Sequence, residues 1–292
     1  MGLLDARTSR RDFLKKTGLA GATVALGGMA APLLAPTGAM ADSNTESVTE
    51  ILGYAVTAEQ LATTFYYTAI GAAANLPQST NSGNLPYLQA ALGAEYFHVQ
   101  LLTGAGGTSL VGNTPSFYFP PGTFSNDTNF LGVLNALETA FIEAYLAAVY
   151  QFTAQGQNGL AQIAGEILGV ESEHRVLGRQ ILTDFTTLKV PNNLVLEQQD
   201  GTSVATVAKA LIPFLSANQF DGKSTGPYMM PTQSQVASAV GNNGGMNPNA
   251  PSMPPDQMPE LPFAGILPAL LGLGGLGYLV SRRRGKADDG AQ

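Results

Sequence analysis

The chain has 292 residues, a formal net charge of −7 and no cysteine. The absence of cysteine excludes disulfide bonds, thiolate ligands and a cysteine nucleophile, so any metal must be held by glutamate, aspartate or histidine. Between the two end segments described below, the chain carries 17 of its 21 acidic and 5 of its 14 basic residues, a net charge near −12. We therefore expect no nucleic acid among its partners.

The N-terminal segment has the features of an export signal. Residues 9–15, with a pair of arginines followed by Phe-Leu-Lys, match the twin-arginine motif. An apolar stretch follows at 18–34, and the Ala-Met-Ala of residues 39–41 offers a cleavage site. This combination predicts a twin-arginine signal peptide over residues 1–41 and export by the twin-arginine machinery.

The middle of the chain predicts an all-α domain over residues 42–220. Apolar residues recur with helical period in four long segments and a shorter fifth one. The expected helices are 48–74, 85–103, 129–154, 158–186 and 203–218. Short polar turns join the first helix to the second and the third to the fourth, which favours antiparallel neighbours, whereas a long stretch at 104–126 separates the two hairpins. We therefore predict an antiparallel four-helix bundle with a long crossover between its second and third helices.

The C-terminal part reads as a spacer followed by a tether. Residues 221–260 are rich in Gly, Asn, Pro and Met and predict a flexible spacer. An almost wholly apolar run and three arginines follow within residues 261–292, which suits a membrane anchor with a basic cytoplasmic tail. Residues Leu261–Gly265 resemble a sortase sorting signal, with Ala264 where threonine is usual. Either reading places the folded domain outside the cell, on the outer face of the cytoplasmic membrane or in the cell wall.

The chain contains two histidines, and each follows a glutamate by three residues. The pairs are Glu95 with His98, on the second predicted helix, and Glu171 with His174, on the fourth. Residues three apart share one face of a helix, so each pair can approach the same metal site. Two such pairs, which use every histidine in the chain, are stronger evidence for a site than one.

The first and third helices carry a second repeated pattern. Glu59 is followed seven residues later by Tyr66, and Glu138 is followed at the same spacing by Tyr145. Because seven residues make about two helical turns, each tyrosine shares a face with its glutamate. The tyrosines are either plain core residues or hydrogen-bond donors to ligating carboxylates. Glu143 lies about 140° around the helix from Glu138 and is kept as a reserve ligand.

These motifs resemble the ferritin-like superfamily over roughly residues 46–186. The Glu-x6-Tyr pattern is most similar to rubrerythrin and bacterioferritin, and the export signal is typical of the exported bacterial ferritin-like domain family. The resemblance implies a site for two metal ions, with iron favoured over manganese, that is built from one glutamate on each of two helices and Glu-x-x-His on the other two. The implied metal ligands are Glu59, Glu95, His98, Glu138, Glu171 and His174.

Two classes of function fit this reading. The first is a redox protein that oxidises ferrous iron or reduces peroxide or O2 at the dinuclear site. The second is a structural or interaction protein of the cell surface, in which any metal only stabilises the bundle. A storage cage is a weaker third idea, because a tethered chain with a long tail does not suit a closed shell. The sequence leaves the oligomeric state open, a dimer included.

Overall fold

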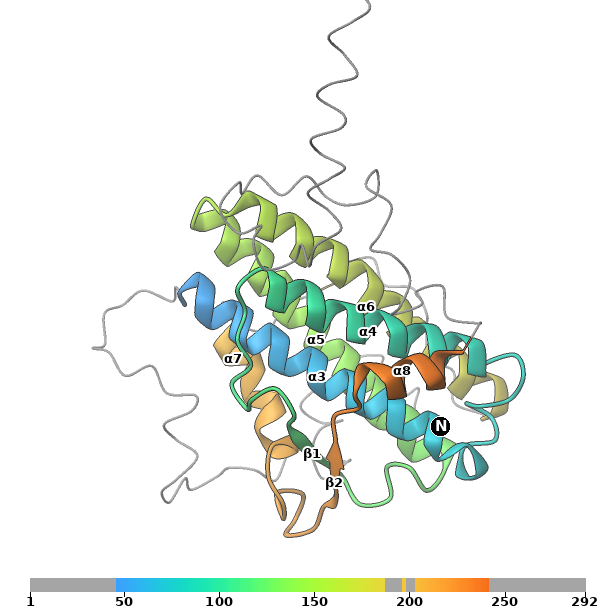
Figure 1. Cartoon of the computed structure of the whole chain (residues 1–292). Coiled ribbons are helices and arrows are strands. Elements are labelled where there is room, and N and C mark those ends of the chain that lie inside the picture. Colours follow the sequence, from blue (N-terminus) through green and yellow to red (C-terminus); the bar gives the residue numbers. More distant parts are fainter. Residues whose placement is uncertain (1–45, 187–195, 198–202, 242–292) are drawn as a thin grey trace, which may run out of the picture.

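The computed structural model describes residues 46–186, 196–197 and 203–241 (Figure 1). The signal peptide predicted at 1–41 and the tether predicted at 261–292, including the sortase-like residues Leu261–Gly265, lie outside the described residues.

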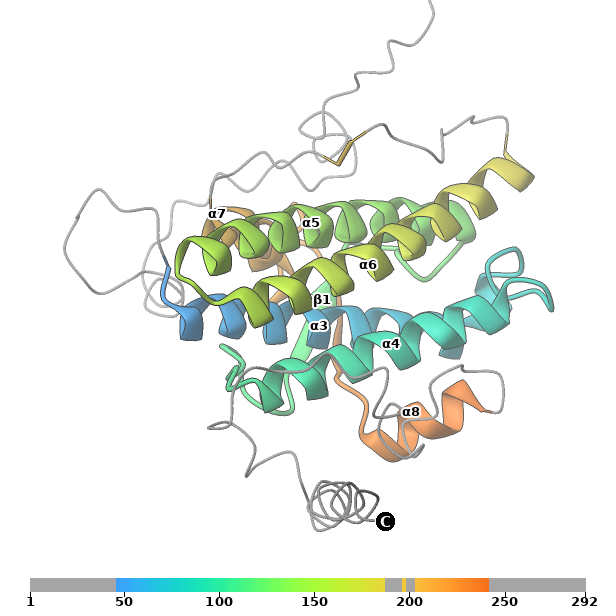
Figure 2. The same ribbon diagram turned by 90° about the horizontal axis from the view of Figure 1, so that it is seen from above.

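Four long helices form the body of the domain. They are α3 (Val48–Gly71), α4 (Leu85–Gly104), α5 (Asp127–Ala154) and α6 (Asn158–Phe185). Viewed from above, α5 and α6 lie side by side in one layer, and α3 and α4 in the other (Figure 2). Residues 72–84 and 155–157 make the short connections within the layers, and residues 105–126 make the crossover between them. The predicted all-α bundle with its crossover is therefore confirmed.

Local chemistry explains where the helices begin. Ser47 caps α3 in a capping box, in which its hydroxyl accepts from the backbone N–H of Glu50 and the Glu50 carboxylate accepts from the backbone N–H of Ser47. Asn126 caps α5 by accepting from the backbone N–H of Asn129, so the helix begins at Asp127, two residues before the start expected from the sequence. The buried carboxylate of Asp127 accepts hydrogen bonds from both the backbone N–H and the hydroxyl of Ser79, which ties the α3–α4 connection to the start of α5.

The segment after the bundle differs from the expectation of one helix over 203–218. It forms a short helix α7 (Val204–Ala208) and then a 3-10 turn η2 (Lys209–Phe214). Pro213 lies inside the 3-10 turn, and a proline there supplies no backbone N–H to continue an α-helix. The hydroxyl of Ser203 caps α7 by accepting from the backbone N–H of Thr206.

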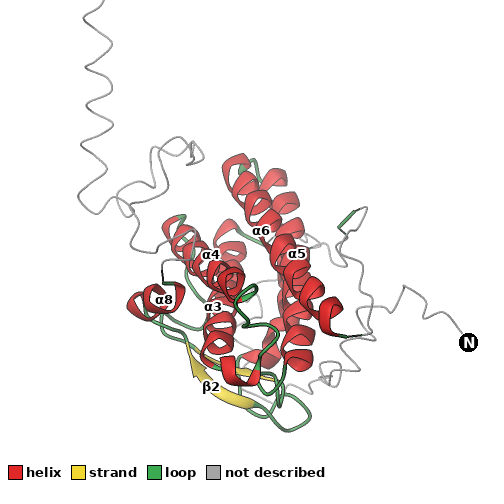
Figure 3. Cartoon of the chain, turned by 90° about the vertical axis from the view of Figure 1, so that its right-hand side faces the viewer, coloured by secondary structure: helices red, strands yellow, loops and turns green. Residues whose placement is uncertain are grey.

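The prediction of a flexible spacer from residue 221 is wrong, because residues 225–240 contain a strand and a helix. Strand β2 (Thr225–Met229) pairs antiparallel with β1 (Ser116–Phe119) from the crossover. Helix α8 (Gln233–Val240) follows and packs against α4, where the Gln89 side chain donates to the backbone carbonyl of Ala239 at 2.8 Å. Both elements lie outside the four long helices (Figure 3). The remainder of the expected spacer, 242–260, is outside the described residues.

The buried apolar side chains form two clusters along the bundle. One contains Phe65, Leu92 and Phe130, and the other contains Ile51 and Phe152. In α4 and α6, the turn that carries the predicted metal ligands lies between residues of the two clusters. Within the described residues, α5 alone is long and apolar enough to span a membrane, but 61% of that stretch is buried, as in the core helix of a bundle.

Candidate metal centre

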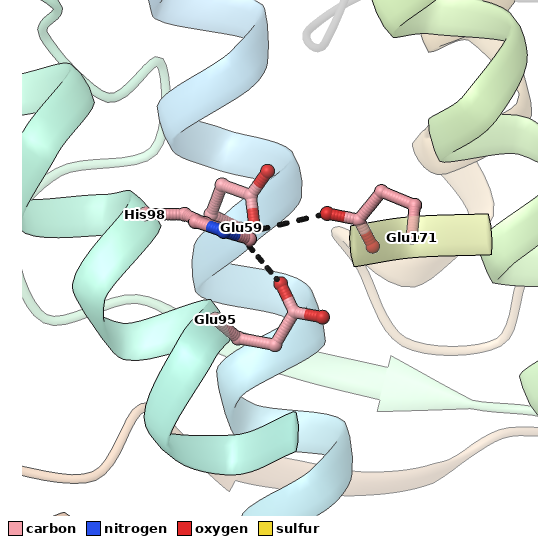
Figure 4. Close-up of side chains that lie close together, drawn as sticks. All are labelled: Glu59, Glu95, His98 and Glu171. Carbon is pink, nitrogen blue, oxygen red and sulfur yellow. Dashed lines mark hydrogen bonds and ion pairs between the residues drawn. The ribbon is translucent and has the colours of Figure 1, made fainter. Parts of the chain in front are cut away.

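All six predicted ligand residues converge in the middle of the bundle. Each of the four long helices contributes one glutamate, and α4 and α6 each add a histidine three residues later. Figure 4 shows four of these side chains pointing toward one another from three helices. The four glutamates are at most 2% exposed, and the histidines are 5% and 7% exposed. The residues that meet are Glu59, Glu95, His98, Glu138, Glu171 and His174.

The first half of the site surrounds His98. Its Nδ1 atom lies 3.3 Å from Oε2 of Glu59, 3.5 Å from Oε2 of Glu95 and 3.5 Å from Oε1 of Glu171. One ligand atom from each of these four residues fits within 4.8 Å of the other three. Three carboxylate oxygens and one imidazole nitrogen at such spacing suit a divalent metal with a preference for oxygen and nitrogen.

The second half of the site surrounds His174. Its Nδ1 atom lies 2.8 Å from Oε1 of Glu95, 3.6 Å from Oε2 of Glu171 and 4.0 Å from Oε1 of Glu138. These four residues form a second group within the same 4.8 Å limit. Glu95 and Glu171 belong to both groups, and each turns one oxygen toward His98 and the other toward His174. This arrangement can bridge two neighbouring metal ions, with Glu59 and Glu138 at the outer ends.

Both predicted tyrosines donate hydrogen bonds to carboxylates of the site, but across the bundle. Tyr66 on α3 donates to Oε1 of Glu138 on α5 at 2.6 Å, and Tyr145 on α5 donates to Oε1 of Glu59 on α3. The sequence placed each tyrosine beneath the glutamate of its own helix. The crossed pairing arises because the hydroxyl at the end of a long side chain reaches the facing helix rather than two turns along its own.

Burial dominates the electrostatics of the site. Burial, reinforced by the neighbouring carboxylates, raises the pKa values of Glu95, Glu138 and Glu171 well above the ordinary glutamate value. Burial would also raise the pKa of Glu59, but His98 and the hydrogen bonds to this carboxylate outweigh it and lower that pKa.

The basic and phenolic groups of the site also shift. Burial opposes charge on the two imidazoles, yet Glu59 beside His98 and Glu95 beside His174 raise the pKa values of both histidines. Burial raises the pKa values of Tyr66 and Tyr145 well above the ordinary tyrosine value, so both phenols remain protonated and able to donate.

The site contains buried polar atoms that lack partners, and these atoms fit a metal. Within the described residues, no hydrogen bond reaches either oxygen of Glu95 or Glu171, Oε2 of Glu138 or Nδ1 of His174. The 2.8 Å approach of His174 to Glu95 therefore lacks the angles of a hydrogen bond. Leaving a buried acceptor unpaired costs about 1–3 kcal/mol. Because these atoms are those that face the two centres, bound cations would satisfy them.

The reserve ligand Glu143 is buried at 8% exposure but belongs to neither group.

Arg175 is a buried charged residue that was not predicted from the sequence. It is 3% exposed and directly follows His174. Its guanidinium forms an ion pair with Glu197. Helical periodicity could have revealed its burial, because Arg175 lies four residues after Glu171 and three before Gly178, on the packed face of α6.

Comparison with known proteins gives one match. Residues 47–184 match the family model described as a ferritin-like domain. No curated protein and no solved structure matched the chain. The matched range begins one residue before α3 and ends one residue before the end of α6, so it covers the whole bundle and every residue of the site. Residues 47–184 are therefore similar to a ferritin-like domain, and their buried carboxylates and imidazoles could hold metal.

Proposed function

We propose that this protein is an exported dinuclear metalloprotein that oxidises ferrous iron with O2 or peroxide. The observation that supports it best is the sharing of Glu95 and Glu171 between two groups of ligands, one around each histidine. Because the two oxygens of each shared carboxylate face different histidines, an ion beside one histidine would leave the oxygen that faces the other histidine unpaired. Two ions, one beside each histidine, would provide a partner for both oxygens of each shared carboxylate. Carboxylate and imidazole ligands suit iron or manganese, and the family resemblance favours iron.

Each side chain has a definite task in this proposal. His98 and Glu59 would hold one ion, His174 and Glu138 would hold the other, and Glu95 and Glu171 would contribute to both. Bound iron would supply one-electron redox chemistry at two adjacent positions. Tyr66 and Tyr145 hold the outer carboxylates in place by hydrogen bonds, as partners of metal ligands commonly do. The apolar clusters on either side keep bulk water away from the site.

The reaction balances with ferrous iron as the reductant. Two ferrous ions give up one electron each, and O2 takes both electrons with two protons to become hydrogen peroxide. With peroxide as the oxidant, the same two electrons and two protons break its O–O bond and yield two molecules of water.

The proposed location is the outer face of the cytoplasmic membrane or the cell wall. It is supported by the twin-arginine motif at 9–15 and by the apolar C-terminal run with its arginines. The twin-arginine machinery exports folded proteins, so the metal could be loaded in the cytoplasm before export. A sortase acting at Leu261–Gly265 or a plain membrane anchor would then retain the domain outside the cell.

Metal analysis of the purified full-length chain tests this proposal. The wild type should bind two ions per chain, and Glu95→Gln, which changes a bridging carboxylate, should lose at least one. Glu143→Gln is the matched control, because this glutamate is buried in the same bundle but belongs to neither group. Ferrous iron oxidation with O2 or peroxide should follow the metal content. Equal metal in all three proteins would rule out the site, and bound but unreactive metal would favour a structural protein of the cell surface.

A further inference from the structure

The two halves of the metal centre have different surroundings. On the Tyr66 side, aromatic rings fill the space: Phe65 contacts Tyr66 with ring centroids 5.7 Å apart and stacks on Phe130 at 5.0 Å. Tyr66 also meets the ring of His174 at 5.6 Å and is fully buried. The half of the centre that contains Glu138 and His174 is therefore backed by closely packed rings.

On the Tyr145 side, a pocket opens between α3, α5, α6 and α7. Its inner wall includes the ring of Tyr145, whose hydroxyl donates to Glu59, and the methyl group of Ala58, the residue before Glu59. Half-buried residues, including Tyr54, Ala55 and Ala144, line its outer part. The pocket thus runs from partly exposed positions to Ala58 and Tyr145, which adjoin Glu59 by chain and by hydrogen bond, although none of the six candidate ligands lines it.

The chemistry of the lining excludes polar ligands. Among the described residues that line the pocket, none is charged, and the tyrosine hydroxyls of Tyr54 and Tyr145 are the only polar side-chain groups. The cavity volume that the centre of a water molecule could occupy is about 30 Å³. About 10–15 Å³ on this measure holds one water molecule, and an apolar cavity of this kind stays dry but accepts apolar gases. The pocket therefore has room for a molecule of about two heavy atoms that needs no hydrogen bonds.

Small residues and an added segment create this space. Alanines at seven positions, contributed by all four of these helices, line the pocket where larger residues would fill it. An unfilled cavity costs stability, so folding alone does not favour it. Val204, Val207, Ala208 and Leu211 cover one side, and these residues follow the range 47–184 that matches the ferritin-like domain. A segment outside the bundle thus completes the pocket beside the metal centre.

We propose that this pocket binds dioxygen and delivers it to the Glu59–His98 half of the centre. The proposal rests on the proposed function and narrows it, because it assigns O2 rather than peroxide as the preferred oxidant. Peroxide carries two hydroxyl groups and would lose its hydrogen bonds to water in a pocket with so little polar lining. Dioxygen is apolar and would lose no hydrogen bonds on entering the pocket. The pocket also makes the two nearly symmetric halves of the site inequivalent.

Xenon binding tests the pocket without metal or turnover. Xenon, an apolar probe, should shift the NMR signals of alanine methyl groups that line the pocket in the full-length chain. Ala55→Phe, which fills the mouth from α3, should abolish those shifts. Ala208→Leu, which fills the pocket from α7, provides a second variant if the first does not fold. Ala90→Phe is the matched control, because Ala90 is a half-buried alanine of α4 that does not line the pocket. Shifts absent from the wild type, or unchanged in both filled variants, would overturn the proposal.

Steady-state kinetics test delivery to the metal. Filling the pocket should raise the KM for O2 several-fold, leave kcat nearly unchanged, and leave both the metal content and the rate with peroxide at their wild-type values. Equal KM values for O2 in the filled variants, the control and the wild type would disprove delivery through the pocket. If the wild-type protein binds no metal, the proposed function fails and delivery fails with it, whereas the xenon experiment still decides whether the pocket accepts an apolar gas.

Discussion

The four glutamates of the centre fall into two kinds according to what holds them. The outer pair, Glu59 and Glu138, each accept a hydrogen bond from a tyrosine, so their orientation does not depend on a metal. In the bridging pair, Glu95 and Glu171, both oxygens of each carboxylate lack a hydrogen bond within the described residues. The outer carboxylates are therefore positioned without a metal, whereas the two shared carboxylates would gain partners from cations bound beside the histidines.

Replacing a tyrosine should loosen one outer ligand. Tyr145→Phe removes the donor to Glu59 while keeping the ring, so we expect metal affinity to fall by roughly 10–100-fold with little change in the fold. Competition with a chelator of known affinity measures this loss. Tyr66→Phe should produce a similar loss at the Glu138 end, since the two tyrosines have equivalent roles. An unchanged affinity in both variants would mean that the phenols only fill space.

Metal binding should release protons from the site. Because the pKa values of Glu95, Glu138 and Glu171 are raised, these carboxyls retain protons in the metal-free protein at pH values where an ordinary glutamate has lost them. A cation must displace those protons, so metal affinity should increase with pH. Titration calorimetry in buffers of different ionisation enthalpy counts the protons released. Binding without proton release would show that the carboxylates are already ionised.

The same shifts make the metal-free fold sensitive to pH. A carboxyl whose folded pKa lies above its unfolded value favours the folded state below the unfolded pKa, and this contribution is lost as pH rises through the folded pKa. The metal-free protein should therefore lose stability as the pH rises above the ordinary glutamate pKa and through the raised pKa values of Glu95, Glu138 and Glu171.

The sequence was sufficient to predict which residues meet at the candidate metal centre, but not which carboxylate each tyrosine contacts. Helical periodicity places Glu95 with His98, and Glu171 with His174, on one face each, so their convergence could be predicted from spacing alone. Spacing does not determine which facing helix a tyrosine hydroxyl reaches. The crossed bonds of Tyr66 and Tyr145 depend on how the helices are arranged around the site, which no single segment specifies.

At the scale of elements, the sequence predicts the long helices well because each has its own period, and α3 and α5 also have capping residues at their starts. Strand β2 and helix α8 were missed because their partners are remote. Residues Thr225–Met229 contain a glycine and a proline and form a strand only because Ser116–Phe119, more than a hundred residues earlier, supplies the hydrogen bonds. The eight residues of α8 are short for a helix on their own and pack against α4.

The start of the crossover packs so closely on α3 that it requires glycine. A Cβ atom at Gly107 would lie 2.8 Å from the carbonyl oxygen of Leu102 and 2.8 Å from Cγ2 of Val56. Gly107→Ala should therefore destabilise the protein by about 1–3 kcal/mol in urea unfolding, the usual cost of overpacking.

Gly169→Ala is the matched comparison for this prediction. Gly169 is exposed in the middle of α6, and a Cβ atom there would meet nothing within 4 Å. Alanine should stabilise the helix at that position by roughly 0.5–1 kcal/mol. Similar effects of both substitutions would contradict the close packing at Gly107.

At the scale of the whole molecule, metal should contribute to stability because its ligands come from all four long helices. Ligand at 100 times its Kd adds about 2.7 kcal/mol, which for a domain of this size corresponds to roughly 5–10 °C in Tm. Thermal unfolding with added metal and with chelator measures the difference. Glu95→Gln should show a much smaller shift, and an equal shift in that variant would place the stabilising metal elsewhere.

The peripheral position of β2 and α8 has a mechanical consequence. These two elements lie between residue 241 and the four ligand-bearing helices along the described chain. Tension applied at that end would act first on the contact between α8 and α4 and then on the two-stranded pairing with Ser116–Phe119. If the domain is held by its C-terminus, tension would thus detach α8 and β2 first. The side chains of the candidate metal centre would keep their positions relative to one another.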